Sequence, residues 1–363
     1  MISFDHDIFS IQRYGGISRY FSELCIHLTE LGADYRVVSG ISQNQYLKNS
    51  KYIKNIGIPV NRYPRGTGRF FQKLNEAALV GISHFQPYDI NHATYYHVRN
   101  TKKTKNVITV YDFIHEKYPN QFQDSTKIIN LKKSAIEKAD GIICISNHTQ
   151  DDLREMYNVS DKLVETIHLG VNKVQTVDKR TGSKVGMYGK FLLYVGDRHG
   201  YKNFQCLLDA YRMLLEFVPN VNLVCFGGGI FSEAEVKSIG TLNTAFKQNV
   251  YQMSGNDTLL NSLYRTAVCL VYPSLYEGFG LPPLEAINQL CPVIVADSSS
   301  IPEVVGSLGT YFDPQSSEDL LAKLHEKCQH PLLNIPNQSA IDHLKCFNMQ
   351  NCAKQTLKFY YTL

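Results

Sequence analysis

Short apolar runs rich in Val, Ile and Leu recur along the chain, and they constrain its fold more than any other feature. The runs are continuous rather than alternating, which is typical of parallel strands covered on both faces. Segments with helical spacing, such as 203–217 and 258–267, lie between them. Strand–helix–strand repetition predicts an α/β fold with doubly wound parallel sheets. The runs are 35–40, 106–112, 141–146, 164–170, 191–196, 221–227, 267–274 and 291–297.

A polar stretch near 171–190 divides these runs into two blocks, so we expect a linker there. The length of 363 residues suits two hydrophobic cores rather than one. The pattern predicts two Rossmann-like domains facing a cleft. We place the first domain at 1–172 and the second at 173–345, and we expect 346–363 to form a terminal helix that crosses back to the first domain.

Composition excludes several classes of protein. No apolar run approaches the roughly 18 residues of a membrane span. The first residues, MISFDHDIFS, lack the basic and then apolar pattern of a signal peptide. The nine cysteines are scattered, without a CxxC or Cys/His cluster, so we expect buried reduced thiols in a cytoplasmic protein and no metal site.

Positive charge is concentrated in the first half of the chain. Residues 1–175 hold 22 Lys+Arg and 17 Asp+Glu, a net +5, whereas the remainder holds 15 and 16, a net −1. The segment 48–73 has seven cations and no carboxylate. It is either an ordinary solvated surface or a patch for an anionic membrane or acceptor. We expect no nucleic-acid partner, because no known binding module is recognisable.

Candidate ligand-binding motifs follow the predicted strands, where ligands of doubly wound sheets bind. Gly15 and Gly16 precede a helical segment and would let a phosphate approach backbone N–H groups. Arg198 and Lys202 follow the strand at 191–196, and two cations there can neutralise a diphosphate. The turn FGGGIF at 226–231 lacks the last glycine of a dinucleotide fingerprint and favours only a tight turn near a ligand.

The stretch SLYEGFGLPPLEA, 274–286, combines two carboxylates with a helix start. Pro282 and Pro283 suit a first helical turn, whose N–H groups have no partner within the helix. We expect the amides of Gly278, Phe279, Gly280 and Leu281 to face an anion, and Glu277 and Glu285 each to hold a sugar diol. Alone, Glu285 would be explained by the helix dipole, worth about 0.3–1 kcal/mol.

Over nearly its whole length the chain resembles the retaining glycosyltransferases of family 4 (glycosyltransferase group 1), which have the GT-B fold. The motifs EGFGLPPLE, GGISRY, VGDRHGYKN, GIICISNHTQDDL and CPVIVADSSSIPEVVG carry the resemblance. It implies that the domain at 1–172 binds the acceptor and the domain at 173–345 binds the nucleotide sugar. It also implies that Glu285 holds the ribose of that nucleotide sugar and that Glu277 contacts the transferred sugar. It also implies that Arg198 and Lys202 bind the diphosphate.

The resemblance further implies that Gly16 and the amides of Phe279 to Leu281 crowd the phosphates. No metal or other cofactor is needed, because Lys and Arg take its place. The family often has His–Asp where this chain has Tyr111–Asp112. Asp112 and His115 are therefore candidate sugar contacts, with Tyr111 and His92 as alternatives to His115.

The function implied is retaining, metal-independent transfer of a hexose from a GDP- or UDP-linked sugar to a glycan or lipid-linked glycan. Synthesis of a surface polysaccharide such as lipopolysaccharide, including mannosyl transfer, fits this activity. The protein would be cytoplasmic, with peripheral membrane contact through Lys48–Lys73. Two alternatives remain at this point: a nucleotide-sugar epimerase of the same fold, and a non-catalytic nucleotide-sugar-binding protein.

Overall fold

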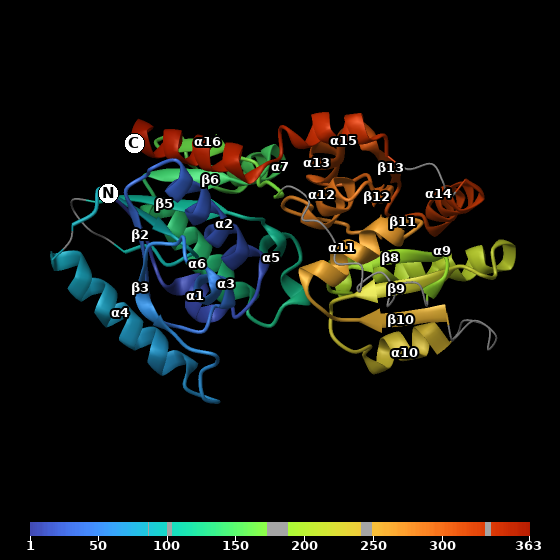
Figure 1. Cartoon of the computed structure of the whole chain (residues 1–363), viewed down its shortest axis with the longest axis horizontal. Coiled ribbons are helices and arrows are strands. Elements are labelled where there is room, and N and C mark those ends of the chain that lie inside the picture. The colour runs from blue at the N-terminus through green and yellow to red at the C-terminus, as the bar shows by residue number, and fades with distance from the viewer. Residues whose placement is uncertain (86, 100–103, 173–187, 241–248, 331–334) are drawn as a thin grey trace. The chain divides into compact units, whose positions relative to one another are not determined.

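The computed structural model describes residues 1–85, 87–99, 104–172, 188–240, 249–330 and 335–363 (Figure 1). The chain forms two compact units. Unit 1 comprises Met1–Gly170 and Phe347–Leu363, and unit 2 comprises Val171–Cys346. Most of the predicted linker, 173–187, lies outside the described residues.

Among the described residues, unit 1 contains one seven-stranded sheet with the order β3-β2-β1-β4-β5-β6-β7. Every neighbouring pair of strands is parallel. The strands are β1 (Ile2–Phe4), β2 (Tyr35–Ser42), β3 (Asn55–Pro59), β4 (Ile90–Ala93), β5 (Lys105–Val110), β6 (Gly141–Cys144) and β7 (Leu163–Thr166).

Helices connect these strands, as the strand–helix repetition predicts (Figure 1). The last helix, α16, belongs to unit 1 and packs against α2. The hydroxyl of Tyr360, on α16, also lies 2.5 Å from Nδ1 of the buried His92, on β4. The helices of unit 1 are α1 (Asp7–Ile11), α2 (Gly16–Glu30), α3 (Gln45–Asn49), α4 (Gly68–Phe85), α5 (Ile114–Lys117), η1 (Pro119–Gln121), α6 (Ser125–Lys138), α7 (Asn147–Met156) and α16 (Met349–Thr362).

Unit 2, where it is described, repeats the plan with a six-stranded parallel sheet in the order β10-β9-β8-β11-β12-β13. The strands are β8 (Phe191–Val195), β9 (Asn222–Phe226), β10 (Val250–Met253), β11 (Cys269–Tyr272), β12 (Val293–Ala296) and β13 (Gly309–Phe312). The helices are η3 (Gly200–Lys202), α9 (Phe204–Phe217), α10 (Glu233–Gly240), α11 (Asp257–Thr266), α12 (Leu281–Asn288), α13 (Ile301–Val305), η5 (Gly306–Leu308), α14 (Ser317–Gln329) and α15 (Asn337–Leu344).

The continuous apolar runs form β2, β5, β6 and β7 of unit 1 and the four central strands of unit 2, and the two parallel sheets confirm the predicted doubly wound α/β class. β8 shows the reason, since all five of its residues are buried and its sheet is covered on both faces. Among the strands that the pattern did not predict, β1 has only three residues, and β4 (INHA), β10 (VYQM) and β13 (GTYF) are interrupted by polar residues or glycine, so none gives a continuous apolar run.

The expectation of buried thiols is only partly correct. All nine cysteines are free, but Cys206 and Cys328 are partly exposed and Cys346 is exposed. No helix in the described parts of the chain is long and apolar enough to cross a membrane.

Candidate active site

Each sheet has a point where the connections change direction, and doubly wound folds bind ligands there. In unit 2 this point lies between β8 and β11, because β8 leads on to β9 while β11 leads on to β12 on the other side. The loop after β8 carries Arg198 and Lys202, and the loop after β11 carries Glu277. A backbone hydrogen bond of 2.8 Å from Leu275 N to Tyr201 O joins the two loops.

Lys202 and Glu277, predicted separately from two motifs, contact each other. Lys202 Nζ donates to Glu277 Oε1 at 2.6 Å, and both side chains are largely buried. Burial alone would lower the pKa of Lys202, but the Glu277 carboxylate and Tyr201 raise it above its ordinary value. Lys202 is therefore a charged ammonium at neutral pH, and the Glu277 carboxylate holds it at the carboxyl end of the sheet. The same carboxylate can also accept a hydrogen bond from a hydroxyl group.

The backbone around Glu277 is anchored by the loop that follows β12. Glu277 N donates to Ser299 Oγ at 2.9 Å, and Ser300 Oγ donates to Glu277 O at 2.8 Å. The helix α12 then starts at Leu281, after Gly280 with a φ of 107°. Glycine suits this left-handed position, and Pro282 lies in the first turn as predicted.

Arg198 lies in an unexpected environment. Its Nε donates to Glu235 Oε1 at 2.6 Å, and its Nη1 donates to the Gly227 carbonyl at 2.9 Å. Its Nη2 contacts the carbonyls of Gly228, Gly229 and Ile230 at 3.0–3.2 Å. Only 2% of the side chain is exposed. The guanidinium thus holds the glycine turn, and its predicted contact with a diphosphate would require these bonds to break.

The glycine turn is shaped for this arginine. Gly227, Gly228 and Gly229 all have φ between 66° and 90°, where residues with a Cβ are strained. A Cβ on Gly228 would lie 2.5 Å from Arg198 Nη1. The predicted tight turn is therefore present, and its glycines let four successive carbonyls, those of residues 227 to 230, face one cation.

Glu285 is the fifth residue of α12, so it follows the first turn rather than lying in it, and it is partly exposed. The Tyr264 hydroxyl, on α11, donates to Glu285 Oε2 at 3.3 Å. This contact orients the carboxylate from a neighbouring helix. Its contact with a ribose remains a prediction.

Gly16, in unit 1, is the first residue of α2 and is exposed. No atom lies within 4 Å of a Cβ built at Gly16, so packing in the described chain does not require glycine there. A ligand that approaches the backbone closely would explain the residue. The predicted phosphate contact stays a prediction.

Asp112 and His115 follow β5, and a buried lysine holds their loop. Lys132 Nζ donates to the Asp112 carbonyl at 2.7 Å and to Glu116 Oε2 at 2.8 Å. His115 is partly buried against the Phe122 ring, and burial lowers its pKa. A neutral imidazole beside an anchored Asp112 is suited to hydrogen bonding with hydroxyl groups.

The alternatives to His115 have buried positions. His92 has no exposed surface, its Nε2 lies 2.9 Å from the Thr109 hydroxyl, and burial lowers its pKa to about 3. Tyr111 is 7% exposed and packs between the rings of Tyr20 and Tyr96. Both side chains serve the core of unit 1, which leaves His115 as the accessible histidine of the three positions considered.

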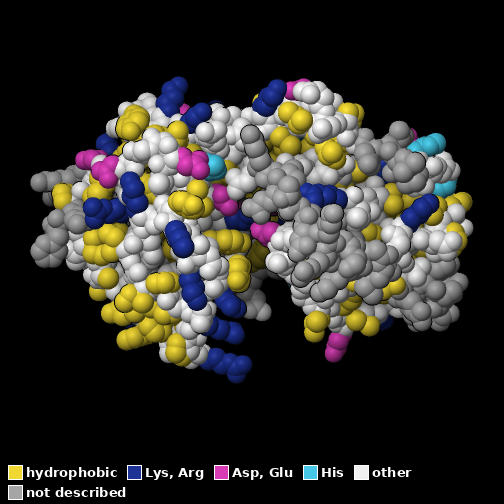
Figure 2. Space-filling model, in the orientation of Figure 1, with side chains coloured by type: hydrophobic (Ala, Val, Ile, Leu, Met, Phe, Trp, Pro, Cys, Tyr) yellow, Lys and Arg dark blue, Asp and Glu magenta, His cyan; other side chains and the backbone are white. Residues whose placement is uncertain are grey.

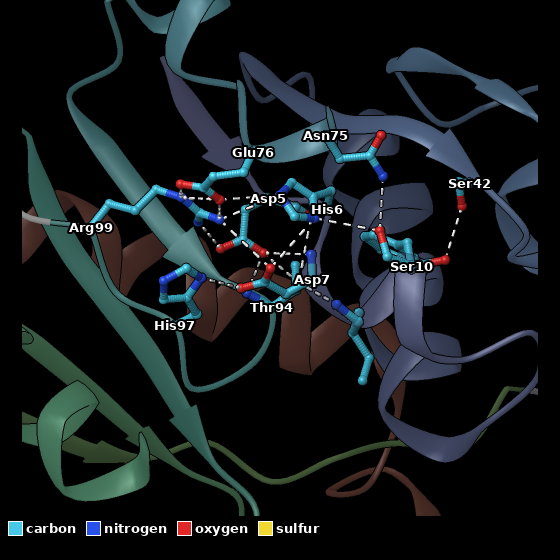
Figure 3. Close-up of polar contacts among 12 residues, drawn as sticks. Asp5, His6, Asp7, Ser10, Ser42, Asn75, Glu76, Thr94, His97 and Arg99 are labelled. Carbon is cyan, nitrogen blue, oxygen red and sulfur yellow. Dashed lines mark hydrogen bonds and ion pairs between the residues drawn. The ribbon is translucent and has the colours of Figure 1, made fainter. Parts of the chain in front are cut away.

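A polar cluster at the switch point of unit 1, between β1 and β4, was missed by sequence reasoning. Figure 3 shows Asp5, Asp7, Glu76, His97 and Arg99 gathered there. The signal was the sequence DHD directly after β1, but a three-residue strand is too short to be recognised. Among the described residues, no group of His, Cys, Asp or Glu side chains could hold a metal ion.

Comparison with protein families gives a match over most of the chain. Residues 14–174 match the family described as Glycosyltransferase Family 4, and residues 178–333 match Glycosyl transferases group 1.

Two curated relatives come from enteric bacteria. The chain is 26% identical over 252 residues to O-antigen chain mannosyltransferase B of Escherichia coli, covering 66% of each protein. It is 27% identical over 212 residues to O-antigen chain mannosyltransferase RfbU of Salmonella typhimurium, covering 58% of this chain and 57% of that protein. The matches thus span 66% and 57% of the lengths of these relatives, less than two thirds in both cases.

Solved structures share the fold. Sucrose-phosphate synthase from Thermosynechococcus elongatus matches with a TM-score of 0.79 and 18% identity over 99% of this chain and 98% of that one. HepE from Anabaena, solved in complex with UDP-glucose, matches with a TM-score of 0.73 and 18% identity over 100% and 99%. With its two parallel sheets and its two family matches, the chain belongs to the group 1 glycosyltransferases of family 4 and has their two-domain Rossmann-like fold.

Proposed function

We propose that the chain transfers a hexose from a nucleoside diphosphate sugar to a glycan acceptor, with net retention and without a metal ion. The observation that carries the proposal is the Lys202–Glu277 pair at the switch point of unit 2. A buried ammonium can stabilise the negative charge of a leaving diphosphate. The adjacent carboxylate can accept hydrogen bonds from the hydroxyls of the sugar that is transferred.

In the proposed reaction, the bond between the anomeric carbon and the diphosphate oxygen breaks while the acceptor oxygen bonds to the same face of the sugar. The acceptor proton passes to an oxygen of the departing diphosphate, so no protein nucleophile is required. Negative charge grows on the diphosphate as the bond breaks. Lys202 stabilises that charge, and Glu277 orients the sugar through its hydroxyls.

The relatives named O-antigen mannosyltransferases favour mannose as the sugar and a surface polysaccharide as the product. HepE was solved with UDP-glucose, but the likeness to it supports the fold alone. We therefore propose a mannosyl donor first and keep both GDP- and UDP-linked hexoses as candidates.

Incubation with radiolabelled nucleotide sugars and mannose-terminated oligosaccharides, in excess chelator, tests the proposal. We expect labelled oligosaccharide whose new linkage has the anomeric configuration of the donor. Isomerised donor would instead indicate the epimerase alternative, and binding without turnover the non-catalytic one. Activity abolished by chelator and restored by magnesium would contradict the metal-free mechanism.

Glu285→Ala should weaken donor binding while the fold is kept. Loss of charge-assisted hydrogen bonds to the ribose should cost about 1.5–3 kcal/mol, about a ten- to hundredfold rise in the dissociation constant. Calorimetric titration with the matching nucleoside diphosphate measures it. The control Tyr264→Phe removes the hydroxyl that orients the carboxylate and should have a smaller effect. Unchanged affinity in a folded Glu285→Ala variant would remove Glu285 from the donor site.

Peripheral membrane contact through residues 48–73 remains a proposal, and the structure changes its details. Ile53 and Tyr63, two of the apolar residues in this segment, are 8% exposed and belong to the core. Tyr52, Ile58 and Phe70 are 64–70% exposed. Figure 2 shows Lys and Arg side chains beside hydrophobic ones on the face of unit 1 that carries α4. Exposed cations beside exposed apolar rings suit an anionic lipid surface.

Lys51, Arg62 and Arg65, changed together to Gln, should weaken sedimentation with anionic vesicles. Each cation near the surface contributes about 1 kcal/mol, so the three should lower the partition coefficient roughly a hundredfold at low salt. Lys105, Lys133 and Lys138, also exposed on unit 1, give a control triple variant of the same charge. Equal binding by the two variants, or equal binding to neutral vesicles, would remove the patch from the account.

A further inference from the structure

Unit 1 contains a pocket of about 630 Å³ at the switch point of its sheet. Its walls come from α1, which follows β1, from the loop after β4, and from α4 and α6. Polar groups on the wall include Asp7, Glu76 and His97. Apolar side chains, among them Ile17 and Tyr95, line the same pocket. This position in unit 1 is equivalent to that of the Lys202–Glu277 pair in unit 2.

A network centred on Arg99 holds the polar wall rigid. Arg99 Nη1 donates to the fully buried Asp5 Oδ2 at 3.0 Å, and Arg99 Nε donates to both oxygens of Glu76 at 2.8 and 3.0 Å. Asp5 Oδ1 also accepts from the Thr94 hydroxyl at 2.5 Å. Hydrogen bonding to Arg99 lowers the pKa of Glu76 to about 2, so this carboxylate is ionised at neutral pH.

Asp7 is the exception in this network. It is 9% exposed, yet its Oδ2 accepts no hydrogen bond from the described residues. The nearest charged partner of this oxygen is His97 Nδ1 at 3.6 Å, beyond hydrogen-bonding distance. Leaving a buried charged acceptor unpaired is costly, so such an oxygen in a pocket wall indicates a missing partner.

His97 is placed to act with Asp7. Its side chain is 56% exposed, and Nδ1 is the ring nitrogen that faces Asp7. The Asp7 carboxylate beside it raises the pKa of His97. With Nδ1–H facing Asp7, the other nitrogen, Nε2, accepts a hydrogen bond from a hydroxyl when the ring is neutral and donates one when the ring is protonated.

We propose that this pocket binds the acceptor, and that Asp7 and His97 hydrogen-bond the hydroxyls of a neutral pyranose at its end. A pyranose has apolar C–H faces and a polar rim of hydroxyls, which match a wall of Ile and Tyr side chains with one carboxylate and one imidazole. The inference rests on the proposed function and adds the acceptor class and two residues to it.

The charge of the wall selects against anionic sugars. Asp5, Asp7 and Glu76 surround one arginine. Burial raises the pKa of Asp5, but Asp7 and Glu76 alone balance Arg99 and a protonated His97, so this cluster carries no net positive charge. Three exposed cations, Arg69, Lys73 and Lys127, also contribute to the pocket lining, but as exposed side chains they are screened by solvent. The buried carboxylates therefore dominate the selection.

Saturation-transfer NMR with methyl glycosides, in the absence of donor, tests the pocket itself. We expect methyl α-mannopyranoside, or its gluco or galacto isomer, to bind wild type, and Asp7→Asn and His97→Gln each to bind at least tenfold more weakly. His27→Gln is the matched control, because it removes a His–carboxylate pair, 2.7 Å from Glu30, that does not line the pocket. His97 is exposed, so its variant should fold even if Asp7→Asn does not.

Three results would overturn the inference: no binding of any neutral methyl glycoside to wild type, equal binding by wild type and His97→Gln, or preferential binding of methyl glucuronide. In transfer assays, His97→Gln should raise KM for the acceptor at least tenfold and leave KM for the donor within twofold. A purely structural role would change both. If wild type transfers no sugar, the proposed function fails, whereas the binding experiment still decides the pocket.

Discussion

Lys202→Met should lower the turnover number about a hundred- to a thousandfold, the loss seen when one donor to a developing oxyanion is removed. The diphosphate gains charge as the glycosidic bond breaks, so the loss falls on the transition state more than on donor binding. Nucleoside diphosphate affinity should therefore fall far less than turnover. Steady-state kinetics and calorimetric titration measure the two quantities.

The Lys202–Glu277 contact complicates that variant, because methionine leaves the buried Glu277 carboxylate without its 2.6 Å partner. The double variant Lys202→Met with Glu277→Gln removes the unpaired charge and should recover stability but not turnover. Lys345→Met is the surface control, since Lys345 also pairs at 2.6 Å, with Asp342, but is 68% exposed. Wild-type turnover in Lys202→Met would reduce Lys202 to a structural partner of Glu277.

The sequence predicted the fold well where apolar runs were long enough to recognise. β8 and β9 lie within the predicted runs, and α9 begins one residue after the start of its predicted segment and ends with it. β1 contains only three residues and β4 includes the polar Asn91 and His92, and the missed polar cluster follows these two strands. Without those strands the switch point of unit 1 could not be placed, so the sequence did not predict that Asp7 and His97 lie close together.

Motif spacing identified candidate site residues but not their partners. Lys202 and Glu277 are 75 positions apart, and only the neighbouring positions of β8 and β11 bring them into contact. The three glycines at 227–229 and Arg198 were interpreted as separate motifs. In the structure the guanidinium donates hydrogen bonds to the carbonyls of these glycines, so the two motifs form one site. A local pattern gives residue chemistry, whereas the order of strands decides which residues meet.

Arg198→Ala should destabilise unit 2 by roughly 3–5 kcal/mol, because it leaves the Glu235 carboxylate, on a side chain only 12% exposed, and the glycine-turn carbonyls without their cation. At about 2–4 °C for each kcal/mol, thermal unfolding without ligand should shift by roughly 6–20 °C. Arg212→Ala is the control, since Arg212 pairs with Asp209 at 3.1 Å on the same unit but is 49% exposed, so it should change stability by about 1 kcal/mol or less.

The same variant separates two roles for Arg198. If Arg198 acts by holding the glycine turn, Arg198→Ala lowers both the ligand-free stability and the turnover number. Glu235→Gln weakens one of the contacts of Arg198, so it should lower both quantities by a smaller amount. If it binds the diphosphate directly, turnover falls in Arg198→Ala while ligand-free stability and the Glu235→Gln variant stay near wild type. The 2% exposure of the side chain and its carbonyl contacts favour the first outcome. Arg198 would then position the backbone of the donor site, and Lys202 would be the cation that meets the leaving group.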